Sequence, residues 1–193
     1  MTDRLPKLLI VIASTRPGRV GLPVGRWFES VARDHGAFEV EVVDLAELQL
    51  PFLDEPNHPR LRRYTKQHTR DWSGTVESAD VFVFVTSEYN YGYPAALKNA
   101  IDFLHVEWQD KALGFVAYGG IAAGTRAMQQ LKPVVLALKL VVANEAVNIA
   151  WVKEKIGDDG ELQADEGMHQ AAAALLNELV RLDGALRLLR AQE

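Results

Sequence analysis

The chain has no cysteine among its 193 residues. This absence excludes disulfide bonds, thiolate-bound metals and a cysteine nucleophile. Long apolar segments are absent as well, and the longest early run, residues 8–13, is too short for a signal-peptide core or a membrane span. We therefore expect a soluble protein of the cytoplasm that has no membrane partner.

The sequence also lacks an excess of positive charge. Its 21 lysines and arginines are outnumbered by 26 acidic residues, which gives a net charge of -5. Surfaces that bind nucleic acid are normally basic, so nucleic acid is not expected as a partner. The composition, 48% hydrophobic and 24% charged, is that of an ordinary globular protein. At this length one core is expected, and we predict a single domain over residues 1–193.

What the sequence does contain is a regular alternation of apolar runs and amphipathic stretches. Such alternation predicts an α/β fold with a doubly wound parallel sheet and helices on both faces. Strands are predicted at residues 7–13, 38–45, 81–85, 111–118 and 140–143, the last with an extended continuation at 147–150. Helices are predicted at 21–34 and 64–78, from 94, around 128–138 and around 172–189, and Pro133 is expected to kink the fourth.

The most informative segment is the strand at 81–85 with the loop that follows it. Its residues, Val-Phe-Val-Phe-Val, show no polar alternation, so both faces of this strand should be covered. Ligands of open α/β sheets bind outside the carboxyl ends of the strands, where the loop at 87–94 lies. The tyrosines and Asn90 of this loop offer flat apolar surface and amide groups, and Gly92 lets the backbone approach a ligand closely. The loop therefore predicts a site for a large planar heterocycle.

A second candidate loop, residues 14–21, joins the first strand to the first helix. The free N–H groups and the dipole of that helix favour an anion there. Ser14, Arg16 and Arg19 can add hydrogen bonds to a phosphate. An N-capping turn with solvated arginines is the alternative, but the place at the first strand-helix turn favours phosphate. Neither a Walker loop nor G-x-G-x-x-G is present, so a single terminal phosphate fits better than a dinucleotide.

A third loop follows the fourth strand and contains Tyr118, Gly119, Gly120 and Gly124. Its glycines allow left-handed backbone and close approach to the edge of an aromatic ring, although a plain glycine-rich turn would have the same sequence. In a sheet of order 2-1-3-4-5 the three loops converge at one edge. Together they would form a phosphate pocket, a ring platform and a clamp for the edge of the ring.

These motifs resemble the flavodoxin-like NAD(P)H-dependent FMN reductases, which include bacterial quinone, chromate and azo-dye reductases. The resemblance is carried by Ser14-Thr15-Arg16 with Gly18-Arg19, by residues 88–92 leading through 94–102, and by Tyr118-Gly119-Gly120. It runs in order over roughly the first three quarters of the chain. The chain departs from the family at Ser87, where proline is usual, and in residues 17–23, which lack a serine often found on the phosphate loop. We expect Arg19 or backbone amides to take the place of that serine.

The resemblance implies a flavodoxin-like, five-stranded parallel sheet of order 2-1-3-4-5, bound FMN, and NADPH or NADH as the hydride donor. Electrons would pass from the nicotinamide through the flavin to a quinone, flavin, azo or metal-oxyanion acceptor in a ping-pong mechanism. Because the flavin carries the chemistry, no catalytic side chain is expected. The expected FMN-binding residues are Ser14, Arg16, Gly18, Arg19, Val20, Glu88, Tyr89, Asn90, Tyr91, Gly92, Tyr118, Gly119 and Gly120.

Two other functions occur on this fold. A flavin-binding electron carrier or redox sensor would lack its own NAD(P)H reaction, but such carriers usually have hydroxyl-rich phosphate loops and strongly acidic surfaces. Arg16, Arg19 and the net charge of -5 favour the reductase, and the arginines favour NADPH over NADH. A phosphoacceptor receiver domain needs clustered acids at the end of the first strand, where Ser14-Thr15-Arg16 stands instead. The sequence does not identify the electron acceptor.

No metal site is predicted. His58 and His68 lie in or near a long connection, residues 47–63, and have no partner at metal-ligand spacing. Residues 158–161 lack the alternating ligands of an EF-hand and are interpreted as a solvated turn.

The helix that begins near residue 94 predicts a homo-oligomer. Leu97, Ile101 and Leu104 share one face, whereas Phe103 points elsewhere and Trp108 follows closely. Apolar surface that is left over after the core is filled commonly forms a twofold interface, so we expect a dimer or tetramer with the flavin site near the interface. The alternative is that Phe103 and Trp108 extend the core.

Overall fold

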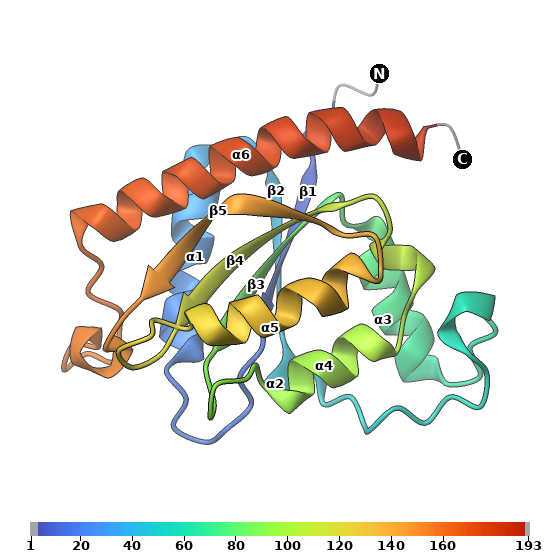
Figure 1. Ribbon diagram of the computed structural model, residues 1–193, viewed down its shortest axis with the longest axis horizontal. Coiled ribbons are helices and arrows are strands. Elements are labelled where there is room, and N and C mark those ends of the chain that lie inside the picture. Colours follow the sequence, from blue (N-terminus) through green and yellow to red (C-terminus); the bar gives the residue numbers. More distant parts are fainter. Residues whose placement is uncertain (1–3, 192–193) are drawn as a thin grey trace.

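A parallel five-stranded sheet forms the middle of the molecule in the computed structural model, which describes residues 4–191 (Figure 1). The strand order is β2-β1-β3-β4-β5, as predicted. Each predicted strand lies within two residues of its observed bounds, apart from the fifth. The strands are β1 (Lys7–Ile12), β2 (Glu39–Asp44), β3 (Val81–Ser87), β4 (Ala112–Tyr118) and β5 (Val141–Ile149).

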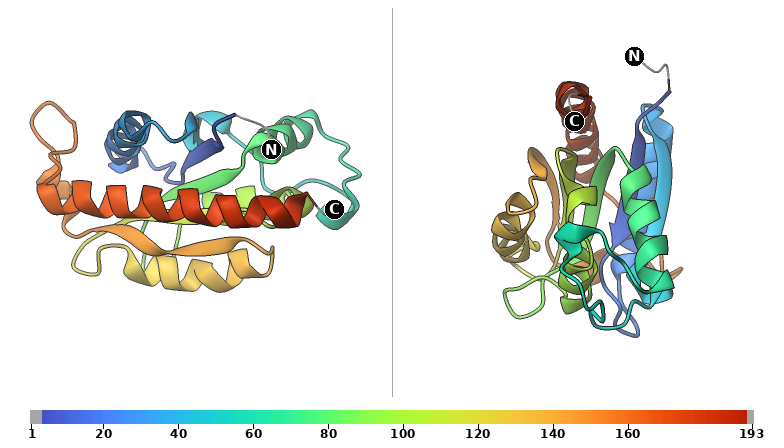
Figure 2. Two further views of the ribbon diagram at one scale, coloured as in Figure 1. Left: turned by 90° about the horizontal axis from the view of Figure 1, so that it is seen from above. Right: turned by 90° about the vertical axis from the view of Figure 1, so that its right-hand side faces the viewer.

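Helices cover both faces of this sheet. One face packs against α1 (Gly21–His35) and α6 (Glu166–Arg190), and Figure 2 shows α6 lying along the length of the sheet. The other face packs against α3 (Gln67–Ser78), α4 (Ala95–Asp102) and α5 (Thr125–Leu136). The short helical turns are α2 (Leu45–Leu48), η1 (Pro59–Leu61), η2 (Val106–Trp108) and η3 (Val152–Lys155).

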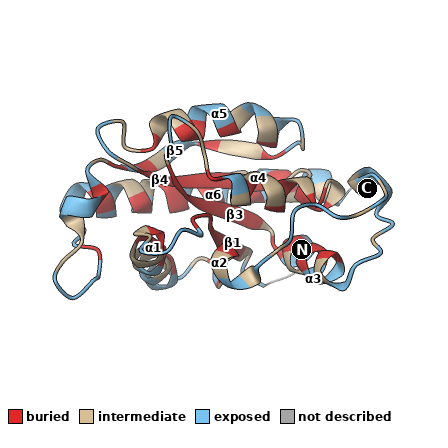
Figure 3. Cartoon of the chain, turned by 90° about the horizontal axis from the view of Figure 1, so that it is seen from below, coloured by how far each residue is buried: buried red, intermediate tan, exposed pale blue. Residues whose placement is uncertain are grey.

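The two faces hold two separate apolar cores, which follow from the alternation of side chains along each strand. In β1, Leu8 and Ile10 face the core under α1 and α6, whereas Leu9 and Val11 face the other core. All residues of β3 and β4 are buried, and Figure 3 shows these strands buried along their length. Since both faces of β3 are covered, its polar groups emerge only where the strand ends.

The fifth strand differs from its prediction for a local reason. The sequence suggests a strand with a break after residue 143, but β5 is continuous and its pairing with β4 shifts register between Leu113 and Phe115. Such a bulge leaves backbone N–H groups without a ladder partner. The carboxylate of Glu178 on α6 accepts the N–H groups of Asn144 (3.1 Å) and Glu145 (2.7 Å) instead.

The apolar surface expected beside α4 is absent. Phe103 is fully buried and Trp108 is 1% exposed, and the indole of Trp108 donates to the carbonyl oxygen of Ile101 at 3.2 Å. Both side chains extend the core under α3, α4 and α5. The argument for an oligomer from these two residues is therefore wrong, and their other interpretation, as core residues, is confirmed.

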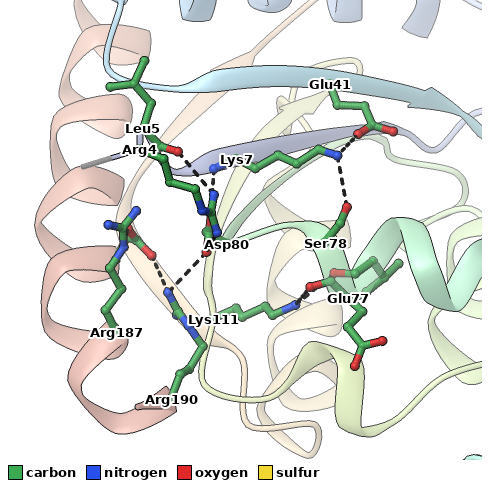
Figure 4. A network of polar contacts seen from close by, with 12 residues as sticks. Arg4, Leu5, Lys7, Glu41, Glu77, Ser78, Asp80, Lys111, Arg187 and Arg190 are labelled. Carbon is green, nitrogen blue, oxygen red and sulfur yellow. Dashed lines mark hydrogen bonds and ion pairs between the residues drawn. The ribbon is translucent and has the colours of Figure 1, made fainter. Parts of the chain in front are cut away.

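Polar side chains tie the elements together at the amino ends of the strands (Figure 4). The Asp80 carboxylate, just before β3, accepts the backbone N–H of Lys7 and the guanidinium of Arg4, each at 2.8 Å. The ammonium of Lys111 is buried beneath α3 and donates to the last carbonyls of that helix, at Val76 (2.9 Å) and Glu77 (3.1 Å). At this end of the sheet the charged side chains of Asp80 and Lys111 are therefore bonded to other groups of the protein.

We predict that Asp80→Asn destabilises the fold in a pH-dependent manner. Burial alone would raise the pKa of Asp80, but the hydrogen bonds from Lys7 and Arg4 outweigh burial and hold that pKa below its ordinary 3.8. The resulting stability is present above pH 3.8 and is lost as the pH falls through the lowered pKa of the folded protein. Urea unfolding at pH 7 should show a loss of about 1–2 kcal/mol, which narrows towards pH 3.

A matched control for this variant is Glu29→Gln, because Glu29 forms only a surface pair with Arg33 on α1. Its unfolding free energy should change by less than about 0.5 kcal/mol. A loss for Asp80→Asn that is constant from pH 7 to pH 3 would contradict the assigned role of the Asp80 charge.

Candidate functional site

Four loops meet at the carboxyl ends of the strands, at the lower left of Figure 1. The loops after β1, β3 and β4 converge as predicted, and the loop after β5 joins them. They enclose a pocket of about 360 Å³, a size usual for small-molecule sites. The pocket is lined by Arg16, Arg19, Val20, Ser87, Glu88, Tyr89, Tyr118, Gly119, Gly120, Trp151, Val152, Lys153 and Glu154.

Three buried hydroxyl groups lie at the foot of this pocket. The hydroxyls of Ser14, Ser87 and Tyr118 are buried, and none has a hydrogen-bond partner within residues 4–191. Burial raises the pKa of Tyr118 to about 12 and outweighs the lowering effect of the Ser14 and Ser87 hydroxyls, which lie near the phenol but outside hydrogen-bond geometry, so the phenol stays protonated at neutral pH. An unsatisfied buried hydroxyl costs free energy, so a cluster of three fits a polar ligand that completes their hydrogen bonds.

The loop between β1 and α1 leaves an anion site open above these hydroxyls. Val20 occupies the N-cap position of α1, and no side chain in the described part of the chain caps the helix. Gly18 adopts a left-handed φ of 69°. Pro23 has no N–H and the Val24 N–H donates to Val20, so the N–H groups of Gly21 and Leu22 are those of the first helical turn that stay available. Arg16 is exposed and lines the pocket. The alternative of a Ser/Thr-capped helix start is wrong.

Arg19 was predicted to contact a phosphate, but its guanidinium bonds to other residues of the protein. Its guanidinium forms a bidentate pair with Asp44 (2.6 Å for the Nη1 contact) and donates to the Ser14 carbonyl oxygen at 2.8 Å. Both charged side chains are largely buried. Arg19 thus presents no free guanidinium to a phosphate, and it fixes the loop instead. No local pattern indicates this pair, because its partners are 25 residues apart.

The expected ring platform after β3 is a tight turn. The N–H groups and carbonyl oxygens of Tyr89 and Gly92 exchange hydrogen bonds at 2.8 and 2.9 Å. Asn90 and Tyr91 between them have left-handed φ values of 49° and 72°, whereas Gly92 does not. A Cβ at Gly92 would meet the chain only at ordinary contact distances. The left-handed residues of this turn are therefore Asn90 and Tyr91, and of the platform residues Glu88 and Tyr89 line the pocket.

Arg126, at the start of α5, connects two of the loops and was not predicted. The Glu88 carboxylate accepts the backbone N–H of Arg126 at 3.1 Å and its guanidinium at 3.2 Å. The same guanidinium lies 4.1 Å from the centre of the Tyr91 ring, a cation-π contact that helps to hold the left-handed turn. Arg126 lies before the helix predicted around residues 128–138, so no sequence signal indicated this link.

The loop after β4 is left-handed at one of its glycines, Gly124, as the sequence allows, and also at Ala123. Gly119 and Gly120 line the pocket with ordinary backbone angles, whereas Ala123 (φ 52°) and Gly124 (φ 79°) make the turn into α5. A side chain at Gly124 would approach the backbone nitrogen of Tyr118 to 2.5 Å, so only glycine fits there. Gly119 also has little room, with the Gly124 nitrogen 3.2 Å from its would-be Cβ.

Residues 151–154 form the fourth wall of the pocket, and they were not among the predicted site residues. The N–H groups of Trp151 and Val152 donate to the carbonyl oxygens of Gly120 (3.2 Å) and Gly119 (3.1 Å). These two bonds attach the end of β5 to the loop after β4. The one sequence signal for this wall was Trp151, an aromatic residue directly after a predicted strand.

Within residues 4–191 no three His, Cys, Asp or Glu side chains gather as metal ligands. His68 contacts Asp54 at 2.9 Å, and the ring of His58 caps η1. No helix in the described residues is both long and apolar enough to cross a membrane.

Comparison with known proteins identifies the family. Residues 6–153 match the family described as NADPH-dependent FMN reductase, so the chain belongs to this family of oxidoreductases. It is 40% identical over 153 residues to a Schizosaccharomyces pombe protein named NAD(P)H-dependent FMN reductase, covering 78% of this chain and 76% of that protein. A Saccharomyces cerevisiae protein of the same name is 35% identical over 155 residues, covering 74% and 81%. The resemblance seen in the motifs is confirmed.

Solved structures confirm the fold class. The flavoenzyme FerB from Paracoccus denitrificans, an NAD(P)H:acceptor oxidoreductase, superposes with a TM-score of 0.74 at 19% identity, covering 94% of this chain and 98% of FerB. A flavodoxin from Streptococcus pneumonia superposes with a TM-score of 0.55 at 15% identity, covering 92% and 99%. At these identities the likeness concerns the fold, which is flavodoxin-like as expected.

We predict that Gly21→Ala disturbs the foot of the pocket. A Cβ at Gly21 would clash with the hydroxyl oxygens of both Ser14 and Tyr118. Because these side chains are buried, urea unfolding should show a loss of about 1–3 kcal/mol. Gly74→Ala is the control, since Gly74 lies in α3 with no atom within 4 Å of its would-be Cβ. That change should stabilise the protein by up to about 1 kcal/mol. Equal stability of Gly21→Ala and the wild type would contradict the packing described.

Proposed function

We propose that this protein is an FMN-dependent oxidoreductase that takes a hydride from NADPH or NADH and reduces a small acceptor. The observation that carries the proposal is a group of three buried hydroxyls that have no hydrogen-bond partner among the described residues and lie beside an uncapped helix start, at the carboxyl edge of the sheet. These groups match the phosphate and hydroxyls of a mononucleotide. We further propose that one domain, residues 1–193, carries the activity.

In this proposal each loop holds one part of FMN. Arg16 and the first N–H groups of α1 bind the phosphate, with Gly18 and Val20 shaping the loop and Arg19 holding it against Asp44. The hydroxyls of Ser14, Ser87 and Tyr118 take the polar groups nearest the phosphate. The ring lies on the turn formed by Glu88, Tyr89, Asn90, Tyr91 and Gly92, and its edge meets Gly119 and Gly120.

The side chains of the site bind and orient rather than react. When bound, FMN supplies the chemistry of accepting a hydride and passing on electrons. Glu88 is paired with Arg126, and the Tyr118 phenol is a hydrogen-bond donor at neutral pH, so neither acts as a free base. Donor and acceptor would use the same open side of the pocket in turn, which is a ping-pong mechanism.

The acceptor is proposed by class. A quinone, a flavin, an azo compound or a metal oxyanion would each fit a permissive open site. A Solanum tuberosum protein named NAD(P)H:quinone oxidoreductase is 33% identical over 150 residues, covering 72% of each chain, which supports a quinone. A Staphylococcus saprophyticus FMN-dependent NADPH-azoreductase is 26% identical over 133 residues, covering 68% and 70%. NADPH and NADH both remain candidates as the donor, because Arg19 is engaged with Asp44.

We also propose a homo-oligomer, from a different surface than the sequence indicated. Phe52 is 85% exposed and Leu53 is 42% exposed on the connection between β2 and α3. Asn99 of α4 holds this segment through the Pro51 carbonyl oxygen (2.7 Å) and the Leu53 N–H (3.0 Å). Such fixed, exposed apolar side chains suit a dimer or tetramer contact, which light scattering at micromolar concentration checks. The cytoplasmic location and the absence of a nucleic-acid partner stay predictions.

The function is tested by reconstituting the protein with FMN and mixing it with NADPH without oxygen. The flavin absorbance should bleach before any acceptor is added, and a quinone should then restore it. Initial rates with both substrates varied should give parallel double-reciprocal lines. FAD in place of FMN, or no flavin uptake, would contradict the cofactor assignment. Flavin uptake with no reduction by either nicotinamide would favour the electron carrier.

We predict that Arg16→Ala weakens FMN binding and leaves the fold intact. Loss of one charge-assisted phosphate contact should cost about 1.5–3 kcal/mol, or roughly ten- to a hundredfold in Kd. Arg26→Ala is the control, because Arg26 lies on α1 outside the pocket and contacts only Glu161 on the surface, at 3.4 Å. An unchanged Kd for Arg16→Ala, measured by flavin titration, would remove Arg16 from the phosphate site.

A further inference from the structure

Trp151 has an unusual backbone conformation at the end of β5. Its φ of 49° and ψ of 41° are left-handed, a region that a large aromatic residue rarely adopts and that costs free energy. Three hydrogen bonds hold it there. Its N–H donates to the Gly120 carbonyl oxygen at 3.2 Å, the Val152 N–H donates to that of Gly119 at 3.1 Å, and the Glu154 N–H donates to the Trp151 carbonyl oxygen at 2.8 Å.

The indole of Trp151 is placed differently from the other large aromatic side chains of the sheet region. Trp72 and Trp108 are each 1% exposed, and their indole N–H groups donate to backbone carbonyls. Trp151 is 52% exposed and lines the pocket beside the loop after β4. A Cβ on Gly120 would lie 4.0 Å from Cζ3 of the indole. The strained backbone therefore holds the solvent-exposed indole of Trp151 at the pocket and does not place it in the core.

We propose that the Trp151 indole is a contact surface for the planar ring of the bound flavin, and thus a fourth wall of the site. The inference rests on the proposed function. Indole offers a flat apolar face that suits a conjugated ring, and it lies beside Gly120, in the segment proposed to meet the ring edge. The connection between β5 and α6, outside the motifs that define the phosphate and ring loops, would then contribute to flavin affinity.

The test compares Trp151→Gly and Trp151→Phe with the wild type in FMN titrations. Glycine adopts the left-handed conformation without strain, so the unliganded variant should unfold within a few degrees of the wild type. Loss of the aromatic contact should raise the Kd for FMN about three- to tenfold, and phenylalanine should retain part of the affinity. Indole in contact with a flavin quenches its emission, so FMN bound to either variant should fluoresce more strongly.

Trp27→Phe is the matched control, because Trp27 lies on α1 outside the pocket. It should change neither the Kd nor the emission of bound FMN. If the wild type binds FMN but Trp151→Gly has the same Kd and the same flavin emission, this inference is overturned while the proposed function stands. The same shift in Trp27→Phe would also overturn it. If the wild type binds no FMN, the proposed function itself fails.

Discussion

Burial of β3 on both faces is the constraint on which the rest of the structure depends. Every residue of this strand is buried, as is every residue of its neighbour β4. The polar groups of the central strands can meet solvent or a ligand only at the strand ends. Parallel pairing then brings the carboxyl ends of β1, β3, β4 and β5 to one edge, and the loops there form the pocket.

Polar groups at the amino ends of the strands differ in their pairing from those at the carboxyl ends. At the amino edge Asp80 pairs with Arg4 and the Lys7 N–H, and Lys111 completes the end of α3. At the carboxyl edge the Ser14, Ser87 and Tyr118 hydroxyls have no partner among the described residues, and the first turn of α1 is uncapped. Single unpaired atoms also occur elsewhere, for example Nη2 of Arg187 near the amino edge, but only at the carboxyl edge do three unpaired hydroxyls of the described residues lie beside a pocket, where a ligand can complete their hydrogen bonds. This contrast, together with membership of the FMN reductase family, supports a mononucleotide at the carboxyl edge.

Most elements were predictable, because buried parallel strands read as apolar runs and the helices carry a clear periodicity. The sheet order followed from the resemblance to the FMN reductases. The predictions that were wrong or missing concern contacts between residues that are far apart in the sequence. The Arg19–Asp44 pair, the Glu88–Arg126 link and the burial of Phe103 and Trp108 cannot be seen in spacing alone. The place of Trp151 depends on hydrogen bonds to Gly119 and Gly120, some thirty residues earlier, so its position directly after a predicted strand does not by itself place it at the pocket. The left-handed backbone at Asn90 and Tyr91 was not predicted, because glycine is the usual residue in that conformation.

The central claim is that FMN binds at this edge with its phosphate on the β1–α1 loop. A crystal structure of the protein with FMN tests it most directly. The account predicts the phosphate at Arg16 and the first N–H groups of α1, and the ring between the turn at Tyr89 and the Gly119–Gly120 segment. FMN bound elsewhere, or a phosphate away from the β1–α1 loop, would contradict it.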